Sequence, residues 1–334
     1  MQNQISFNAE NRAILHGETM YTAVIPMPVF GRGFGFIMKE ERVAAVMNKK
    51  PREERKEIFE ETRRIYGRDR RLADSISFSK DHQSVITEDM EAAPPAGRYD
   101  APAKVLVSQR RCLEAAAGYP GMKVCVLNFA SASNPGGGVA NGANAQEESI
   151  CRCSTLYACI SDETAVSRFH NAHREALKAG RMNALYNNDC IYTPKVTVFR
   201  DDNTEKVLEE TFWYEIDVIS CAAPNLRNIP GNAMNPDSGR KAVVIQPADL
   251  LELHKKRISR VLDIAAAKGA DVMVLGAFGC GAFRNPPAIV AEAVSEVLGV
   301  YLRCFRVIEF AVYCQPADTR NYDVFQRVLS PVCS

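Results

Sequence analysis

The run Lys123–Phe129 constrains the fold of this chain more than any other stretch. Its centre, Val124-Cys125-Val126-Leu127, is continuously apolar, as is typical of a strand covered on both faces. The shorter run Val272–Leu275 has the same character. Because strands buried on both faces belong to sheets with helices on either side, the two runs predict an α/β layer structure with a mainly parallel or mixed sheet.

Strands and helices alternate through the rest of this part of the chain, as that architecture requires. No internal repeat interrupts the alternation. The other expected strands are Lys104–Val107, Val196–Phe199, Tyr214–Cys221 and Val307–Tyr313, and the expected helices are Cys112–Ala117, Ala145–Cys159, Ala165–Ala179, Arg257–Lys268, Ala288–Leu298 and Tyr322–Leu329.

Residues 1–100 differ from residues 101–334 in being charged and helical in pattern. Pro51 suits the first turn of a helix that runs to about Tyr66. The stretch Ala92–Gly97 reads as a linker because it is rich in alanine and proline. We therefore expect an N-terminal helical extension or accessory region, residues 1–100, followed by the main domain, residues 101–334.

Composition excludes several classes of protein. The 334 residues include 41 Lys and Arg against 40 Asp and Glu, so overall charge does not favour nucleic-acid binding. The 11 cysteines form no CxxC pair, the first residues lack the basic start and apolar run of a secretory signal, and no apolar run approaches the roughly 20 residues of a membrane span. We expect a cytoplasmic protein with reduced thiols.

Two glycine-rich loops each follow one of the buried strands. The first, Asn128–Gly138, ends in three consecutive glycines, and the second is Gly276–Asn285. Ligands of open α/β sheets bind at the carboxyl ends of the strands, and glycines let backbone N–H groups approach an anion closely. The second loop lacks the Lys-Ser/Thr of a P-loop and the third glycine of a dinucleotide fingerprint. It nevertheless favours a diphosphate.

Paired carboxyl groups follow the three glycines after a gap of seven residues, in the sequence Gln146-Glu147-Glu148. Neighbours at a helix start point in different directions, so one can hold sugar hydroxyls while the other transfers a proton. Burial and like charge raise the pKa of one of them, as a general acid needs. Glycosidic cleavage commonly uses carboxyl groups in this way. Alone, the three residues also fit an ordinary acidic first turn of a helix.

The combination of three glycines, a seven-residue gap and Gln-Glu-Glu resembles the signature of poly(ADP-ribose) glycohydrolases. The segment Asn128–Ser154 resembles the microbial type of this family closely, and Gly279–Phe283 resembles its diphosphate loop. Tyr192–Val196 and Ala222–Arg227 also look like the family. The resemblance implies a macrodomain-like three-layer fold, with a mixed sheet between helices and an ADP-ribose cleft at the strand ends.

The resemblance also implies roles for individual residues. Glu148 is the implied acid and base, Glu147 positions the ribose under attack, and Gln146 sets the geometry of the loop. The remaining implied binding residues are Asn134, Gly136, Gly137 and Gly138 for ribose and phosphate, and Gly279, Cys280, Gly281, Ala282 and Phe283 for the diphosphate and terminal ribose. Pro224 and Asn225 are candidates for adenine binding by position only.

The function expected from these residues is hydrolysis of ribose–ribose bonds in poly(ADP-ribose), with ADP-ribose as the product. Two alternatives are an ADP-ribose-binding macrodomain without turnover and a hydrolase that removes mono-ADP-ribose from protein or nucleic acid. The expected substrate is the polymer or an ADP-ribosylated protein, with no membrane partner and no stable nucleic-acid complex. The chemistry needs no cofactor and no metal. His170 and His173 could bind a metal by their spacing, but no third ligand is visible in the sequence.

Overall fold

The structure, a computed structural model, describes residues 50–90, 96–233 and 235–333, all within one compact unit, Arg42–Ser334. A seven-stranded sheet forms its centre, in the order β1-β4-β5-β3-β6-β7-β2. Strand β4 runs antiparallel to both β1 and β5, whereas β5, β3, β6, β7 and β2 are parallel. The strands are β1 (Ser84–Ile86), β2 (Lys104–Ser108), β3 (Val124–Phe129), β4 (Cys190–Val198), β5 (Tyr214–Cys221), β6 (Val272–Leu275) and β7 (Val307–Ala311).

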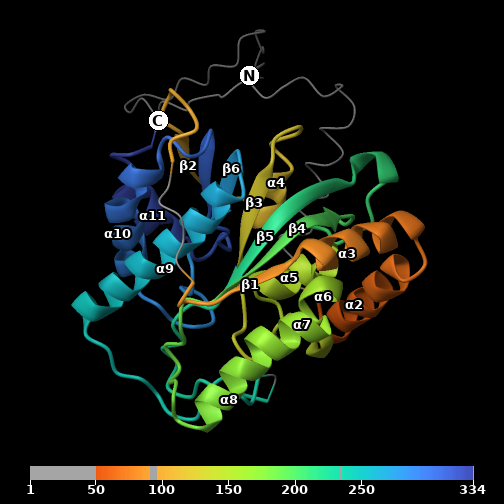
Figure 1. Ribbon diagram of the computed structural model, residues 1–334, viewed down its shortest axis with the longest axis horizontal. Coiled ribbons are helices and arrows are strands. Elements are labelled where there is room, and N and C mark those ends of the chain that lie inside the picture. The colour runs from red at the N-terminus through yellow and green to blue at the C-terminus, as the bar shows by residue number, and fades with distance from the viewer. Residues whose placement is uncertain (1–49, 91–95, 234, 334) are drawn as a thin grey trace, which may run out of the picture. The chain divides into compact units, whose positions relative to one another are not determined.

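Helices cover both faces of the sheet, which confirms the three-layer arrangement (Figure 1). One face carries α9 (Pro247–Ala267), α10 (Pro287–Leu298) and α11 (Arg320–Leu329), drawn in blue shades. The other carries the helices from the first two thirds of the described chain, which are α2 (Arg52–Tyr66), α3 (Arg70–His82), α4 (Cys112–Ala116), α5 (Gln146–Cys153), α6 (Leu156–Ile160), α7 (Glu163–Ala165), the π-helical turn Val166–Asn171 and α8 (Ala172–Lys178).

Strand β3 lies between β5 and β6 and contributes to both apolar cores. Val124 and Val126 pack into the core under α4 and α5, whereas Cys125 and Leu127 pack into the core under α9 and α10. This alternation is the pleat of a strand buried on both faces, so the prediction for Lys123–Phe129 is confirmed. It also places the end of β3, where the first glycine-rich loop begins, in the middle of the sheet.

Several expected elements have different bounds. The single helix expected over Ala145–Cys159 is wrong, because Ser154 is extended and pairs with Val198 beside the sheet, which ends α5. Strand β4 begins six residues before the predicted start at Val196, since a bulge between Thr193 and Val196 accommodates Pro194. Helix α9 begins at Pro247, ten residues before the predicted start.

The first part of the described chain packs against the sheet. Strand β1 pairs with β4, and Ser79 of α3 donates a hydrogen bond to the carbonyl of Pro194. Helix α2 begins at Arg52, directly after Pro51, while most of the expected linker Ala92–Gly97 lies outside the described residues. Where the chain divides into domains stays a prediction. Within the described ranges, no helix combines the length and apolar character needed to cross a membrane.

Candidate functional site

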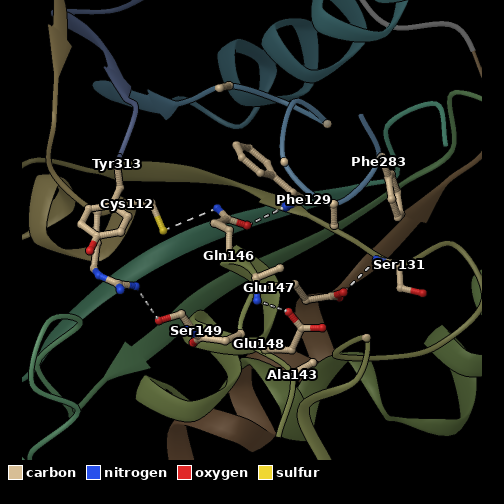
Figure 2. A pocket seen from close by; sticks show the side chains of 18 of the residues that line it. Cys112, Phe129, Ser131, Ala143, Gln146, Glu147, Glu148, Ser149, Phe283 and Tyr313 are labelled. Carbon is tan, nitrogen blue, oxygen red and sulfur yellow. Dashed lines mark hydrogen bonds between the residues drawn. The ribbon is translucent and has the colours of Figure 1, made fainter. Parts of the chain in front are cut away.

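A cleft of ≈ 1140 Å³ opens at the carboxyl ends of the parallel strands, where both glycine-rich loops lie. Its floor includes the beginning of α5, with Gln146, Glu147 and Glu148, and one wall is the loop Gly279–Phe283. Figure 2 shows the two carboxylates between Gln146 on one side and Ser131 on the other. The structure therefore brings together the two motifs that are about 130 residues apart in the sequence, as the strand-end rule predicts.

Backbone N–H groups hold both carboxylates in place. Glu148 accepts hydrogen bonds from the N–H of Gly138 at 2.9 Å and from that of Ala145 at 2.8 Å, one on each oxygen. Glu147 accepts one from the N–H of Ser131 at 2.8 Å and a longer one from Nδ2 of Asn128 at 3.4 Å. The side chains thus take different partners, although they come from adjacent positions. Both lie in the floor of the cleft, and neither is free to rotate without losing these bonds.

Burial and a neighbouring charge shift the acidity of Glu147. Glu147 is buried, with 3% of its surface exposed, and Glu148 is 6% exposed. Burial, and secondly the neighbouring charge of Glu148, raise the pKa of Glu147 well above its usual value, against the hydrogen bond from Ser131. Glu147 can therefore hold a proton at a higher pH than an exposed glutamate does.

Gly137 is the residue of the first loop that lies against the two carboxylates. Its φ is +58°, in the left-handed region that glycine tolerates. A Cβ at this position would lie 2.5 Å from Oε1 of Glu148 and 3.0 Å from Oε2 of Glu147. The glycine therefore makes room for the carboxylates in addition to allowing the turn.

Gln146 ties the start of α5 to the end of β3. Its Oε1 accepts a hydrogen bond from the N–H of Phe129 at 2.8 Å, and its Nε2 donates one to the carbonyl of Leu127 at 2.7 Å. The amide thus continues the backbone pattern of the strand edge, which fixes where the carboxylates begin.

The loop Gly279–Phe283 is closed by the side chain of Asn285, which no motif in the sequence marks. Asn285 donates hydrogen bonds to the carbonyls of Gly279 at 3.1 Å and Pro224 at 2.7 Å, and its Oδ1 lies 2.9 Å from Nε2 of His254. Gly279 has φ +77°, and a Cβ there would lie 2.5 Å from Nδ2 of Asn285. An asparagine after a glycine-rich loop is too common for its role to be recognised from sequence.

Eight of the predicted site residues line the cleft: Gly137, Gln146, Glu147, Glu148, Gly279, Gly281, Ala282 and Phe283. The other four, Asn134, Gly136, Gly138 and Cys280, do not line it. Gly138 still contributes its N–H to Glu148, and Asn134 donates from Nδ2 to Oδ1 of Asn235 at 3.0 Å. Cys280 packs against the apolar core.

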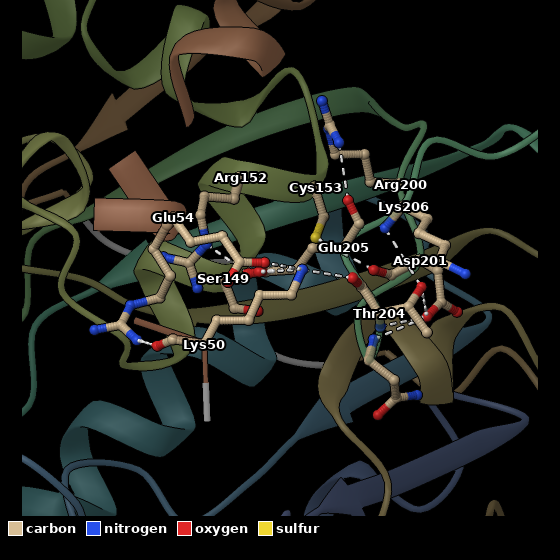
Figure 3. Close-up of polar contacts among 12 residues, drawn as sticks. Lys50, Glu54, Ser149, Arg152, Cys153, Arg200, Asp201, Thr204, Glu205 and Lys206 are labelled. Atoms are coloured by element: carbon tan, nitrogen blue, oxygen red, sulfur yellow. Dashed lines mark hydrogen bonds and ion pairs between the residues drawn. The ribbon is translucent and has the colours of Figure 1, made fainter. Parts of the chain in front are cut away.

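A buried ion pair supports the segment between the glycines and the carboxylates (Figure 3). Arg152, fully buried, lies 2.5 Å from the carboxylate of Glu205 and donates to the carbonyl of Ala143 at 2.8 Å and to Oδ1 of Asn144 at 2.7 Å. Lys50 adds a second cation, 3.3 Å from Glu205. Arg152 thereby holds the residues just before Ala145, whose N–H binds Glu148. No sequence pattern identified this role, because Glu205 is 53 residues away.

Two arms of the cleft extend from the carboxylates, and Figure 2 shows Tyr313 and Cys112 on one side and Phe283 and Ser131 on the other. We call the first the aromatic arm. It is lined by Arg111, Cys112, Phe129, Leu275, Ala277, Ala311, Val312 and Tyr313, with Cζ of Arg111 4.3 Å from the centroid of the Tyr313 ring. We call the second the polar arm, which is lined by Ser131, Arg227, Asn232, Asn235 and Ser238.

The adenine candidates proposed by position do not line either arm. Asn225 is fully buried and donates to the carbonyl of Pro230 at 3.3 Å, and Pro224 accepts the hydrogen bond from Asn285. Both residues instead shape the loop behind the cleft. The aromatic arm has the flat, apolar surfaces that a purine needs.

The two histidines considered as metal ligands are core residues. His170 and His173 are 1% and 2% exposed, and Nδ1 of each faces a backbone carbonyl, of Ala132 and Phe169 respectively. Burial lowers the pKa of His170 to about 3, so the ring is neutral. The residues that the structure describes contain no cluster of three or more His, Cys, Asp or Glu side chains arranged to hold a metal.

A mixed seven-stranded sheet between helices, with a ligand cleft formed by glycine-rich loops at the strand ends, defines the macrodomain class of α/β proteins. Residues 52–201 match the catalytic domain of microbial-type PARG, the poly(ADP-ribose) glycohydrolases. The chain belongs to this family of glycohydrolases, and the matched region includes both carboxylates.

Solved structures agree with this assignment. Poly(ADP-ribose) glycohydrolase from Thermomonospora curvata is 31% identical, with a TM-score of 0.68 over 83% of this chain and 99% of that one. A structure of the same enzyme with the inhibitor ADP-HPD is 29% identical, with a TM-score of 0.66 over 82% and 99%. The Deinococcus radiodurans enzyme in complex with ADP-ribose is 29% identical, with a TM-score of 0.62 over 77% and 98%. No curated protein matches the chain.

Proposed function

We propose that this protein hydrolyses the ribose–ribose O-glycosidic bonds of poly(ADP-ribose) and releases ADP-ribose. The observation that carries the proposal is the pair Glu147 and Glu148, buried beside Gly137 and facing the same cleft as the loop Gly279–Phe283. Paired carboxyl groups are the groups that glycosidic cleavage commonly uses. The related enzyme from Deinococcus radiodurans binds ADP-ribose, which agrees with this substrate.

The two arms suggest how the terminal ADP-ribose unit lies. Its adenine fits the aromatic arm, against Tyr313 and its stacked Arg111. The diphosphate then meets the glycine-rich loop at Gly279 and Gly281, whose backbone approaches without a Cβ contact. The remaining ribose lies between Phe283 and the carboxylates. This orientation points the bond to be cleaved toward the polar arm.

Glu148 acts first as acid and then as base. As the bond between the anomeric carbon and the bridging oxygen breaks, Glu148 gives its proton to that oxygen, which leaves as a ribose hydroxyl of the adjoining unit. Glu148 then takes a proton from a water molecule, whose oxygen bonds to the anomeric carbon. The products are ADP-ribose and a polymer shortened by one unit, and the enzyme regains its starting protonation.

Glu147 positions the ribose. Its raised pKa favours the protonated form, which can both donate a hydrogen bond to one sugar hydroxyl and accept one from another. A neutral neighbour also removes the like charge that would oppose ionised Glu148 after the first step.

The decisive experiment measures release of ADP-ribose from poly(ADP-ribose) and, separately, from mono-ADP-ribosylated protein. We expect wild type to cleave the polymer, Glu148→Gln to lose activity by about a hundredfold or more, and Glu147→Gln to lose it less while binding ADP-ribose more weakly. Calorimetric titration with ADP-ribose and thermal unfolding check that each variant is folded. Equal rates for wild type and Glu148→Gln would refute the mechanism.

The same experiment separates the alternative functions. Binding of ADP-ribose by wild type without cleavage of either substrate identifies a binding macrodomain. Cleavage of the mono-ADP-ribosylated protein alone identifies a mono-ADP-ribose hydrolase that uses the same carboxylates.

A further inference from the structure

The polar arm of the cleft has a lining unlike that of a site for one nucleotide. Its residues are hydroxyl, amide and guanidinium groups, which come from the loop after β3 and from the loop between β5 and α9. The whole cleft, at ≈ 1140 Å³, is larger than the 300–1,000 Å³ range that is typical of sites for one small ligand. Space and hydrogen-bonding groups therefore remain beyond the carboxylates once a terminal ADP-ribose unit occupies the aromatic arm.

Arg227 is the cation of this arm. It is half-buried and lines the cleft, and its guanidinium has no hydrogen-bond or ion-pair partner among the residues of the described ranges. Its backbone is fixed, because its N–H donates to Oδ1 of Asn225 at 3.3 Å. The guanidinium therefore has five N–H donors available beside the cleft. Such a group can bind a phosphate through two parallel hydrogen bonds.

Arg227 lies near Phe283, at the part of the cleft where the ribose under attack is expected. Leu226, the preceding residue, donates its backbone N–H to the carbonyl of Phe283 at 2.9 Å. The charge of Arg227 also acts on the hydroxyl of Tyr186, whose ring centroid lies 6.3 Å from that of Phe283. The backbone next to Arg227 is thus bound to the end of the loop Gly279–Phe283, where the ribose under attack lies. This end is on the side of the cleft opposite the aromatic arm.

Side chains suited to sugar hydroxyls accompany Arg227. Oδ1 of Asn235 accepts from Nδ2 of Asn134 at 3.0 Å and from the Ser131 hydroxyl at 3.4 Å. Ser131 is also the residue whose N–H holds Glu147, so the hydroxyl-binding group adjoins the carboxylates. The hydroxyl groups of Ser238 and Ser133 are hydrogen-bonded at 3.1 Å. This bond connects the loop between β5 and α9 to the loop after β3.

We propose that the polar arm, with Arg227 and Asn235, is a subsite for the departing ADP-ribose unit, and that it binds a phosphate and the ribose of an adenosine diphosphate group. This inference rests on the proposed function, because it assumes cleavage of a ribose–ribose bond at the carboxylates. Its consequence is selectivity: a substrate whose leaving group carries a nucleotide gains binding energy that a simple alcohol cannot provide.

The test compares two substrates that share the terminal unit and differ in the leaving group. One is the two-unit oligomer of poly(ADP-ribose), and the other is the O-methyl riboside of ADP-ribose at the anomeric position, which releases methanol. For Arg227→Ala and Asn235→Ala we expect kcat/KM for the two-unit oligomer to fall about tenfold or more, as for a lost charge-assisted hydrogen bond. The loss for the methyl riboside should be at least fivefold smaller, and the Kd for ADP-ribose should change less than twofold.

Arg240→Ala is the matched control, because it removes the same charge from the same loop at an exposed position outside the lining. It should not change the ratio of kcat/KM between the substrates. Arg227→Lys, which keeps the charge but not the paired donors, should lie between wild type and Arg227→Ala, and it covers the case in which alanine prevents folding.

Three results would overturn the subsite. They are an equal loss on both substrates, a matching loss of ADP-ribose affinity, which would place Arg227 on the terminal diphosphate, and an equal effect of Arg240→Ala, which would indicate bulk charge. Failure of wild type to cleave either substrate is a different outcome and refutes the proposed function instead.

Discussion

Replacement of Gly137 by alanine tests the geometry of the carboxylate pair most directly. A residue with a Cβ in the left-handed region costs about 1–2 kcal/mol of folding free energy. At Gly137 the added Cβ would also lie 2.5 Å from Oε1 of Glu148, so that carboxylate must move by roughly 1 Å to reach an ordinary contact. The move breaks the hydrogen bond from Gly138, and a charge-assisted bond of this kind contributes about 1.5–3 kcal/mol. We expect Gly137→Ala to destabilise the protein by about 2.5–5 kcal/mol in total.

Gly180 provides a matched control for this variant. It also has a positive φ, of +71°, but its Cβ would have no neighbour within 4 Å. Gly180→Ala should therefore cost only the backbone term of about 1–2 kcal/mol and keep its activity within about twofold. A misplacement of about 1 Å at the reacting groups costs about a hundredfold in rate, so Gly137→Ala should lose about that much in kcat.

Urea unfolding gives the two changes in stability, and release of ADP-ribose from the polymer gives the two rates. The assay must be run at a temperature at which both variants remain folded. A Gly137→Ala variant that is as active as Gly180→Ala would refute the assignment of the carboxylates as the reacting groups. Equal stability of the two variants would show that the space beside Gly137 is not filled by carboxylates as described.

Further predictions concern the supporting groups, the pH dependence and the metal requirement. Arg152→Met leaves the carboxylate of Glu205 buried beside Lys50 alone, so we expect a loss of about 3–5 kcal/mol in urea unfolding and a lower kcat; a stability equal to wild type would contradict the role of the ion pair. Burial lowers the pKa of His170 to about 3 and that of His254 to about 4, so NMR of the ring protons should show neither titrating between pH 5.5 and 8. In the unfolded chain each histidine binds a proton below its usual pKa of about 6.5, whereas in the folded chain it does not. Each histidine's contribution to stability is therefore complete above pH 6.5. As the pH falls below that value, the free energy of unfolding decreases by up to about 1.4 kcal/mol per pH unit for each histidine. Activity should survive excess EDTA, and its loss with recovery on adding a divalent metal would contradict a mechanism carried by carboxylates alone.

The features of the fold that follow from short-range pattern could be predicted. The apolar runs of β3 and β6 predict strands in the middle layer, because a strand covered on both faces shows no alternation of polar and apolar residues. Each of these strands is followed directly by one of the glycine-rich loops. The same reasoning placed the loop with Glu147 and Glu148 and the second glycine-rich loop at one edge of the sheet, whereas the role of Phe283 came from the family resemblance. These predictions depend only on neighbouring residues and on the general rule for ligand sites at strand ends.

Features that depend on partners distant in sequence could not be predicted. Ser154 ends a helix because Val198 pairs with it, and β4 passes through Pro194 because a bulge absorbs the missing N–H donor. Arg152 looks like an ordinary helical arginine until Glu205 and Ala143 are placed around it. In each case local propensity is overridden by tertiary contacts, which a single sequence does not reveal.

The position of β2 has a consequence for synthesis of the chain. Its partner in the sheet is β7, about 200 residues later. The entropy cost of closing so long a loop is offset only when β2 and β7 pair. While the ribosome adds those residues, β2 presents unpaired N–H and C=O groups along its edge, which can pair with another nascent chain. A chaperone that shields this strand should therefore raise the yield of soluble protein more than one that acts after release, and a slower rate of translation through residues 109–306 should lower it.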